Sequence, residues 1–153
     1  MTVIVWDGKV LATDRAATDG AAQWQTTKAW YFGEGRDCLI LSGSGPVQAI
    51  LQMRDWFVGG ALRNEFPSVQ LTSHFCHFVV VSPYVGLYRF EQGVPPIDHG
   101  YEPCAFGEGR DFALGAMSMG ANAAKAVEVA NKHSIHCDLG VATYELEYSK
   151  DAI

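Results

Sequence analysis

The chain opens with two short apolar runs separated by a tight turn. The runs Val3–Trp6 and Lys9–Thr13 flank the dipeptide Asp7-Gly8, which strongly favours a two-residue hairpin turn. A hairpin across this turn would carry Asp14 back beside Thr2. The pattern therefore predicts that a threonine and a carboxylate meet at the start of the fold.

Apolar and polar positions along the rest of the chain predict further strands and three helices. Period-two or short continuous apolar runs indicate strands at Lys28–Phe32, Cys38–Leu41, Cys76–Ser82, Val85–Phe90, Tyr101–Phe106 and Val141–Tyr148. Apolar residues at helical spacing indicate helices over Val47–Val58, Asp111–Met119 and Asn122–His133. Residues 15–20 are expected to form a turn-rich link, and residues 21–27 are of mixed polarity. Residues 64–73 are expected to be a polar turn with a short helical remnant, and Pro95-Pro96 to lie in a loop.

The order of these elements is strands, one helix, strands, two helices and a strand. Because strands and helices come in groups and do not alternate one by one, the order favours a layered α+β architecture over a doubly wound sheet. The hexapeptide Phe-Gly-Glu-Gly-Arg-Asp occurs at 32–37 and again at 106–111. One copy is expected to turn a hairpin and the other to open a helix, so it is not interpreted as a structural repeat.

Composition narrows the class of protein. The 153 residues are 48% hydrophobic and 18% charged, which is typical of one globular domain, here 1–153, and not of a disordered chain or a coiled coil. The net charge of -6 argues against nucleic acid or an anionic membrane as partner. No apolar run is long enough to span a bilayer, and Asp7 does not suit a signal peptide. A cytoplasmic protein is expected.

The four cysteines, Cys38, Cys76, Cys104 and Cys137, are widely scattered. Nothing indicates secretion, so reduced and mostly buried thiols are expected rather than a disulfide framework.

Thr2 suggests a specific chemistry at the start of the chain. A threonine hydroxyl needs a base to take its proton, and a free α-amine, with a pKa of about 7.7 to 8.0, can do so near neutral pH. Removal of Met1 would give Thr2 both groups. A nearby cation would hold down the pKa values of both groups, and a carboxylate would hold that cation. Lys28 and Asp14 are suitable residues for these two tasks.

Several motifs in a fixed order resemble a known family. They are Thr2-Val-Ile-Val, the stretch 8–18 (Gly-Lys-Val-Leu-Ala-Thr-Asp-Arg-Ala-Ala-Thr), Lys28-Ala-Trp, Ser42-Gly-Ser-Gly45, and the later stretches 105–117, 124–130 and 141–146. Together they are similar to the proteasome β-type subunits of the N-terminal nucleophile (Ntn) hydrolase superfamily. The resemblance implies a four-layer αββα sandwich of two antiparallel sheets. Because the family's second long helix is replaced by a short polar stretch between Gly60 and His74, we expect a compact version with a shortened first helical layer.

The resemblance also implies roles for particular residues. Thr2 matches the nucleophile, Asp14 the carboxylate after the second strand, and Lys28 the lysine at the start of the next strand. The backbone N–H of Gly43 matches the oxyanion donor, which can contribute several kcal/mol to transition-state stabilisation.

Two further positions match less closely. Asp138 corresponds to a supporting aspartate near the C-terminus, at a shorter spacing to the following glycine than in the family. Glu108 stands where the family usually has a serine that hydrogen-bonds the terminal amine, and a carboxylate could also accept from an ammonium. The resemblance implies a peptide or amide substrate and a homo-oligomer, and it leaves the oligomer size and any unfoldase partner open.

Histidines near cysteines raise the alternative of a metal site. His74-Phe-Cys-His77 and His133-Ser-Ile-His-Cys137 offer nitrogen and sulfur ligands. Their spacings fit no structural zinc pattern, and a strand would send adjacent side chains to opposite faces. The glycine pairs at 33–35 and 43–45 lack the residues that a phosphate loop needs. The sequence therefore predicts no metal and no cofactor.

Two functions follow from the sequence. The first is a threonine-nucleophile amide or peptide hydrolase that removal of Met1 activates. The alternative is a non-catalytic protein that retains Met1 and uses the fold for assembly or binding.

Overall fold

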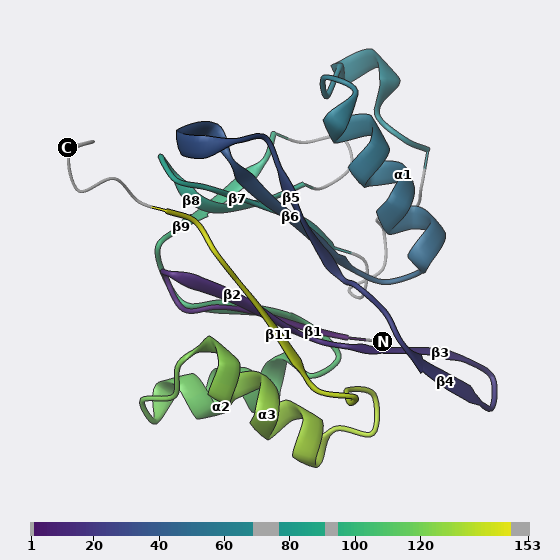
Figure 1. Ribbon diagram of the computed structural model, residues 1–153, viewed down its shortest axis with the longest axis vertical. Helices are drawn as coiled ribbons and strands as arrows, with labels where there is room; N and C mark the ends of the chain where they lie inside the picture. Colours follow the sequence, from purple (N-terminus) through teal and green to yellow (C-terminus); the bar gives the residue numbers. More distant parts are fainter. Residues whose placement is uncertain (1, 69–76, 91–94, 148–153) are drawn as a thin grey trace.

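Two antiparallel sheets lie face to face between helices, as Figure 1 shows. The structure is a computed structural model, and it describes residues 2–68, 77–90 and 95–147. Helix α1 (Val47–Val58) covers the outer face of one sheet, and α2 (Arg110–Ser118) and α3 (Ala123–His133) cover the outer face of the other. The predicted four-layer αββα sandwich is confirmed.

The first sheet contains the opening hairpin. Its strand order is β10-β1-β2-β11, with bounds β1 Val3–Trp6, β2 Val10–Asp14, β10 Cys104–Gly107 and β11 Val141–Glu145. Within the hairpin, Ile4 lies opposite Thr13. Gly8 in the turn has a φ of 94°, a conformation that favours glycine. The predicted hairpin is confirmed, and β1 becomes a central strand of the sheet.

The second sheet has five strands in sequence order, β5-β6-β7-β8-β9. Their bounds are β5 Ala29–Phe32, β6 Leu39–Ser44, β7 His77–Ser82, β8 Gly86–Phe90 and β9 Ile97–Gly100. Consecutive strands pair as antiparallel neighbours. The predicted strands 28–32, 76–82 and 85–90 are present within one residue at each end, although Cys76 itself lies outside the described residues, and the strand predicted at 38–41 runs three residues further, to Ser44.

The core follows from the two-residue period of the strands. Ile4 and Trp6 of β1 point between the sheets and pack in one cluster with Ile40 and Leu87 of the opposite sheet. The intervening Val3 and Val5 point the other way, into a cluster with residues of α2 and α3. All four β1 side chains are fully buried, because this strand has a packed layer on each face.

The helices begin and end close to the predicted residues. α1 has the predicted bounds, and the side chain of Asn122 caps α3 by accepting from the backbone N–H of Lys125 at 2.9 Å. Between α1 and residue 68 there is one 3₁₀ turn, Arg63–Glu65, consistent with the predicted short polar stretch, while residues 69–76 lie outside the described part. No helix in the described ranges is long and apolar enough to cross a membrane.

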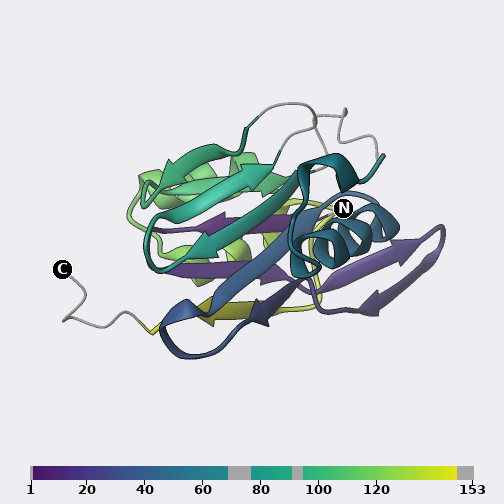
Figure 2. The same ribbon diagram turned by 90° about the horizontal axis from the view of Figure 1, so that it is seen from above.

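One prediction about the fold was wrong. The expected turn-rich link, 15–20, and the mixed-polarity residues after it form a two-stranded ribbon, β3 (Ala16–Asp19) paired with β4 (Ala22–Gln25). The ribbon extends beyond the sandwich in both views (Figures 1 and 2), and all four β4 residues are exposed. Alanine, aspartate and glutamine are weak strand formers without apolar alternation, which is why the pattern gave no strand. The signal that could have found it is Gly20, which has a φ of 58° and with Ala21 joins the paired residues Asp19 and Ala22.

Strand β9 (Ile97–Gly100) was also missed. β9 follows Pro95-Pro96 at once, and prolines next to a run usually demote it to a loop. Among the described residues β9 is the last strand in its sheet, paired with β8, and an edge position tolerates a preceding proline.

The cysteine prediction holds for the described part of the chain. Cys38, Cys104 and Cys137 are free thiols, Cys137 buried and the other two partly buried. Burial raises the pKa of Cys137 to about 11 and that of Cys104 to about 12. Cys76 lies outside the described residues.

Candidate active site

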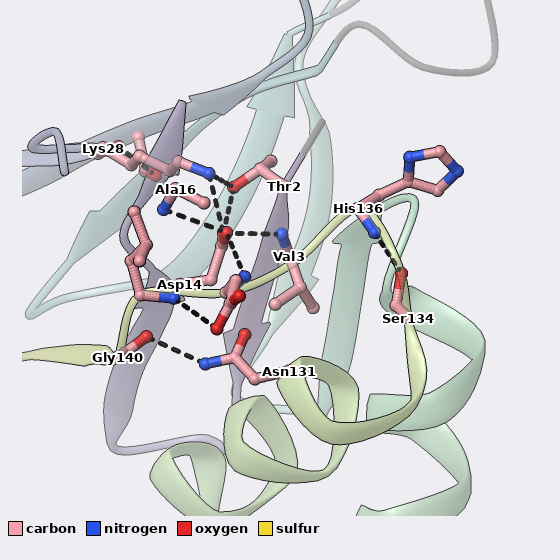
Figure 3. Close-up of polar contacts among 12 residues, drawn as sticks. Thr2, Val3, Asp14, Ala16, Lys28, Asn131, Ser134, His136 and Gly140 are labelled. Atoms are coloured by element: carbon pink, nitrogen blue, oxygen red, sulfur yellow. Dashed lines mark hydrogen bonds and ion pairs between the residues drawn. The ribbon is translucent and has the colours of Figure 1, made fainter. Parts of the chain in front are cut away.

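Three strand ends deliver three polar side chains to one place. Thr2 precedes β1, Asp14 ends β2, and Lys28 directly precedes β5. The hairpin brings the first two together within one sheet, and the second sheet supplies the lysine from across the sandwich. Figure 3 shows the three side chains converging on one point.

The contacts among these three groups are short, and the three side chains are largely buried. Lys28 Nζ donates to Thr2 Oγ1 at 2.7 Å and to Asp14 Oδ1 at 2.8 Å. Thr2 Oγ1 in turn donates to Asp14 Oδ1 at 2.5 Å. Exposed fractions are 3% for Thr2, 0% for Asp14 and 9% for Lys28. The threonine hydroxyl is therefore held between a cation and a carboxylate inside the protein.

Asp14 accepts hydrogen bonds from several groups. Besides the threonine and the lysine, its Oδ1 accepts from the backbone N–H of Val3 at 3.0 Å. Its Oδ2 accepts from the backbone N–H groups of Ala16 at 3.3 Å and Asp138 at 3.4 Å. A buried carboxylate is costly unless it is paired and hydrogen-bonded, and these five donors compensate Asp14.

The electrostatics of Lys28 combine two opposing effects. Burial lowers its pKa below the usual 10.5, because desolvation penalises the charged form, and the nearby charge of Asp14 raises it in part. The hydroxyl of Ser42 donates to the backbone carbonyl of Lys28 at 2.7 Å, which fixes the chain where the side chain begins. The result is a positioned cation that gives up its proton more easily than an ordinary lysine.

Gly43 lies in β6 where its neighbours leave no room for a side chain. A Cβ atom there would lie 2.5 Å from Ile50 Cδ1 and 2.9 Å from the backbone oxygen of His77. The glycine therefore lets α1 approach the strand. Gly43 lines the same cleft as Thr2, and its role as an N–H donor to an oxyanion stays a prediction.

A cleft of about 920 Å³ opens over the threonine. Its walls come from β3, the segment before β5, the end of β6, α1 and the turn before α2. The residues lining it are Thr2, Ala16, Ala17, Thr18, Gln25, Thr26, Thr27, Lys28, Trp30, Gly43, Ser44, Gly45, Pro46, Val47, Ile50, Leu51, Arg54, Gly107 and Glu108. This volume is within the range typical of sites for small molecules and peptide segments.

Glu108 reaches the cleft from the turn between β10 and α2. The residues on either side contact Thr2: Gly109 donates its N–H to the backbone oxygen of Thr2 at 3.3 Å, and a Cβ atom on Gly107 would overlap that oxygen. The Glu108 carboxylate lies 3.0 Å from Nδ1 of His136. Sequence reasoning missed His136 as a partner, since it weighed this histidine only as a metal ligand.

Asp138 contacts the site through its backbone. Its N–H donates to Asp14, whereas its own carboxylate accepts from the backbone N–H of Leu139 at 2.7 Å. Asp138 is thus near the three central residues, as the sequence placed it, but the contact that the structure gives it is main-chain. The catalytic roles of all six residues stay predictions.

The alternative of a metal site finds no support among residues 2–68, 77–90 and 95–147. Within these ranges no three histidine, cysteine, aspartate or glutamate side chains converge as a metal would require. His74 and Cys76 lie outside them.

Comparison with known proteins identifies the fold. No protein-family model and no curated protein sequence matches the chain. Three solved structures are similar. BPH from Thiobacillus denitrificans in complex with epoxomicin has a TM-score of 0.68 and 17% identity over 97% of this chain and 98% of that chain, and HslV from Trypanosoma brucei has a TM-score of 0.63 and 14% identity over 95% of this chain and 98% of that chain. Anbu from Pseudomonas aeruginosa, in a helical assembly, has a TM-score of 0.65 and 9% identity over 96% of this chain and 81% of that chain. The fold is therefore the proteasome β-like fold of the Ntn hydrolases, and the resemblance predicted from sequence is confirmed at the level of the fold.

Proposed function

We propose that this chain is a threonine-nucleophile hydrolase of peptide or amide bonds, and that removal of Met1 activates it. The observation that carries the proposal is the buried contact of Lys28 Nζ with both Thr2 Oγ1, at 2.7 Å, and Asp14 Oδ1, at 2.8 Å. A structural threonine at a strand start has no need of a buried cation against its hydroxyl. An activated nucleophile does, because the cation favours the ionised oxygen.

In the proposed reaction, Thr2 Oγ1 attacks the carbonyl carbon of the scissile amide. The free α-amine of Thr2 takes the hydroxyl proton and passes it to the leaving amine. The backbone N–H of Gly43 donates to the oxyanion that develops on the carbonyl oxygen. Water then hydrolyses the resulting ester and regenerates the threonine.

The neighbours of Thr2 have distinct parts in this scheme. Lys28 stabilises the developing negative charge on Oγ1, and Asp14 keeps the lysine in place. Glu108 supplies a carboxylate on the cleft wall that can accept from the terminal amine. With Met1 attached, the Thr2 nitrogen is an amide and cannot act as a base, so the site would be catalytically inactive.

The test begins with the N-terminal residue of the protein. Intact mass of protein purified from a host with methionine aminopeptidase should show that Met1 is lost. Turnover of fluorogenic peptide amides should then require the hydroxyl: Thr2→Ala should lower kcat/KM on the order of 10³-fold or more, while Thr2→Ser should retain measurable activity. Since the BPH structure contains epoxomicin, a mass increase on incubation with epoxomicin, absent in Thr2→Ala, provides a second readout.

Two outcomes would contradict the proposal. One is equal turnover by the Thr2→Ala variant, and the other is a fully retained Met1 together with no labelling by epoxomicin. The second result would instead favour the alternative, a non-catalytic assembly or binding protein.

We also propose that the chain forms a homo-oligomer. The support is the P. aeruginosa Anbu structure, which is a helical assembly of a chain with this fold. Light scattering coupled to size-exclusion chromatography checks this, and a monomer at micromolar concentration would contradict it.

A further inference from the structure

The cleft wall beside α2 carries a carboxylate that is paired with an imidazole. Glu108 lines the cleft, and its Oε2 lies 3.0 Å from Nδ1 of His136. The two side chains are 28% and 39% exposed, respectively, so the pair is partly shielded from water. A carboxylate offers about four acceptor sites on two oxygens, so the contact through Oε2 leaves acceptor capacity on Glu108 for a second donor.

The register of the first sheet brings Glu108 to the level of Thr2. Val3 of β1 lies opposite Gly107 of β10 in an antiparallel pair, and one further step along this register pairs Thr2 with Glu108. The chain turns away from the sheet at Gly107, which has a φ of 92°, but Gly109 still donates its N–H to the backbone oxygen of Thr2 at 3.3 Å. The side chain of Glu108 therefore begins beside the residue whose α-amine the proposed reaction needs.

His136 belongs to a short loop, residues 134–138, that is fastened at both ends. At the α3 end, the Oγ of Ser134 accepts from the backbone N–H of His136 at 3.2 Å, as Figure 3 shows. At the other end, the backbone N–H of Asp138 donates to Asp14 Oδ2 at 3.4 Å. One loop thus contacts the buried carboxylate through its backbone and the cleft carboxylate through its imidazole.

Cys137 packs this loop against the turn that carries Glu108. Its side chain is 2% exposed, and a Cβ atom on Gly109 would lie 2.6 Å from its Sγ. Burial raises the pKa of this thiol to about 11, and the charges of Asp14 and Glu108 add to the effect. The thiol is therefore close to both carboxylates and stays protonated near neutral pH, so it fills the space between them without a charge.

We infer that His136 is a positioning residue of the proposed reaction: it holds Glu108 so that the carboxylate accepts from the α-amine of Thr2 once Met1 is removed. A neutral imidazole donates through Nδ1–H and an imidazolium also does, so either form can orient the carboxylate. An acceptor that binds one N–H of the amine restricts rotation about the Cα–N bond. The lone pair of the nitrogen can then be directed at the proton on Thr2 Oγ1. The inference rests on the proposed function, because it concerns the base of the same reaction.

The first experiment measures turnover of a fluorogenic peptide amide by variants of His136. His136→Leu removes the donor and should lower kcat about tenfold, the lower end for a hydrogen bond to a charged group, because the pair is partly exposed. KM should stay within about twofold, since the substrate contacts are unchanged. His136→Asn, whose amide N–H₂ lies close to the position of Nδ1, should restore most of kcat.

Two controls separate positioning from a merely structural pair. His133→Leu removes an exposed histidine in the last turn of α3 that does not line the cleft, and it should leave kcat unchanged. In a Glu108→Ser background, His136→Leu should change kcat by less than about twofold, because the group through which it acts is gone. An undiminished loss in that background, or equal kcat of His136→Leu and wild type, overturns the inference.

A structural measurement distinguishes failure of this inference from failure of the proposed function. In crystals of protein without Met1, a carboxylate oxygen of Glu108 should lie within about 3.2 Å of the Thr2 nitrogen, and in His136→Leu it should lie farther away. If neither protein turns over peptide but the carboxylate moves in this way, the proposed hydrolysis fails while the positioning role of His136 stands. A Glu108 carboxylate that lies away from the Thr2 nitrogen in wild type, or that occupies the same place in both proteins, overturns the inference.

Discussion

Replacing Asp14 with asparagine tests whether the buried pair is organised as the structure indicates. The substitution keeps the shape of the side chain and removes its charge. Lys28 would then be a buried cation without its carboxylate, and the new amide N–H₂ would face backbone N–H donors that now bond to a carboxylate oxygen. Breaking a buried ion pair by removing one partner costs about 3 to 5 kcal/mol. This is a large part of the ~5–15 kcal/mol that stabilises a typical domain.

The same change alters the dependence of stability on pH. The pKa of Lys28 is below 10.5 in the folded protein, so the unfolded chain binds more protons between the two pKa values. The free energy of unfolding should therefore rise with pH across that window, which ends at the unfolded value. Asp14 raises the pKa of Lys28, so Asp14→Asn should extend the window to lower pH.

Urea unfolding at several pH values, at one protein concentration, measures both effects. The double variant Asp14→Asn with Lys28→Met removes the stranded charge, so it should recover about 2 kcal/mol of the loss and abolish the added pH dependence. Asp111→Asn is the matched control, because its carboxylate is 86% exposed and pairs with the neighbouring Arg110 at the surface, and it should cost at most about 1 kcal/mol. If Asp14→Asn costs no more than this control, the argument from the buried pair is refuted.

Two further predictions concern a glycine and the thiols. Gly43→Ala should destabilise the protein by about 1 to 3 kcal/mol, because its Cβ would lie 2.5 Å from Ile50 Cδ1, whereas Gly115→Ala, which meets nothing within 4 Å in α2, should be neutral or stabilise it by up to about 1 kcal/mol. Thermal melts of the two variants check this, and equal melting temperatures would contradict it. Cys104 and Cys137, whose pKa values are raised to about 12 and about 11, should resist iodoacetamide at pH 8 in the folded protein and react in urea, because only the thiolate is nucleophilic. Peptide mass mapping checks this prediction, and rapid labelling of either thiol in the folded protein would contradict it.

The pattern of apolar, polar and turn residues was sufficient to predict an element wherever that element's own residues include a turn motif or a regular apolar spacing. The Asp-Gly turn fixes the opening hairpin, and the helical spacing of apolar residues fixes α1 at Val47–Val58. The β3–β4 ribbon lacks such a signal apart from its turn, since its residues are mostly alanine, glutamine and other polar types. It exists because strands can pair through the backbone whatever their side chains.

Some contacts of the candidate site could likewise be predicted from the sequence, and others depend on how the helices and sheets pack. A threonine beside a carboxylate follows from the hairpin alone, since Thr2 and Asp14 flank two paired strands. Glu108 and His136 are 28 positions apart in the sequence, and their contact depends on how α2 and α3 pack. No residue spacing in the sequence predicts it. The main-chain bond from Asp138 to Asp14 is equally a product of the packing.

By itself, then, the sequence determined which residues are chemically suited to one another: a threonine that loss of Met1 would make N-terminal, a carboxylate on its hairpin and a lysine at the start of a strand. The tertiary structure decided that they meet. Placing Lys28 against Thr2 requires two sheets to close over a shared apolar core, and that burial also lowers the pKa of the lysine. Distances across a sandwich and desolvation are properties of the packed chain, so only the fold could supply them.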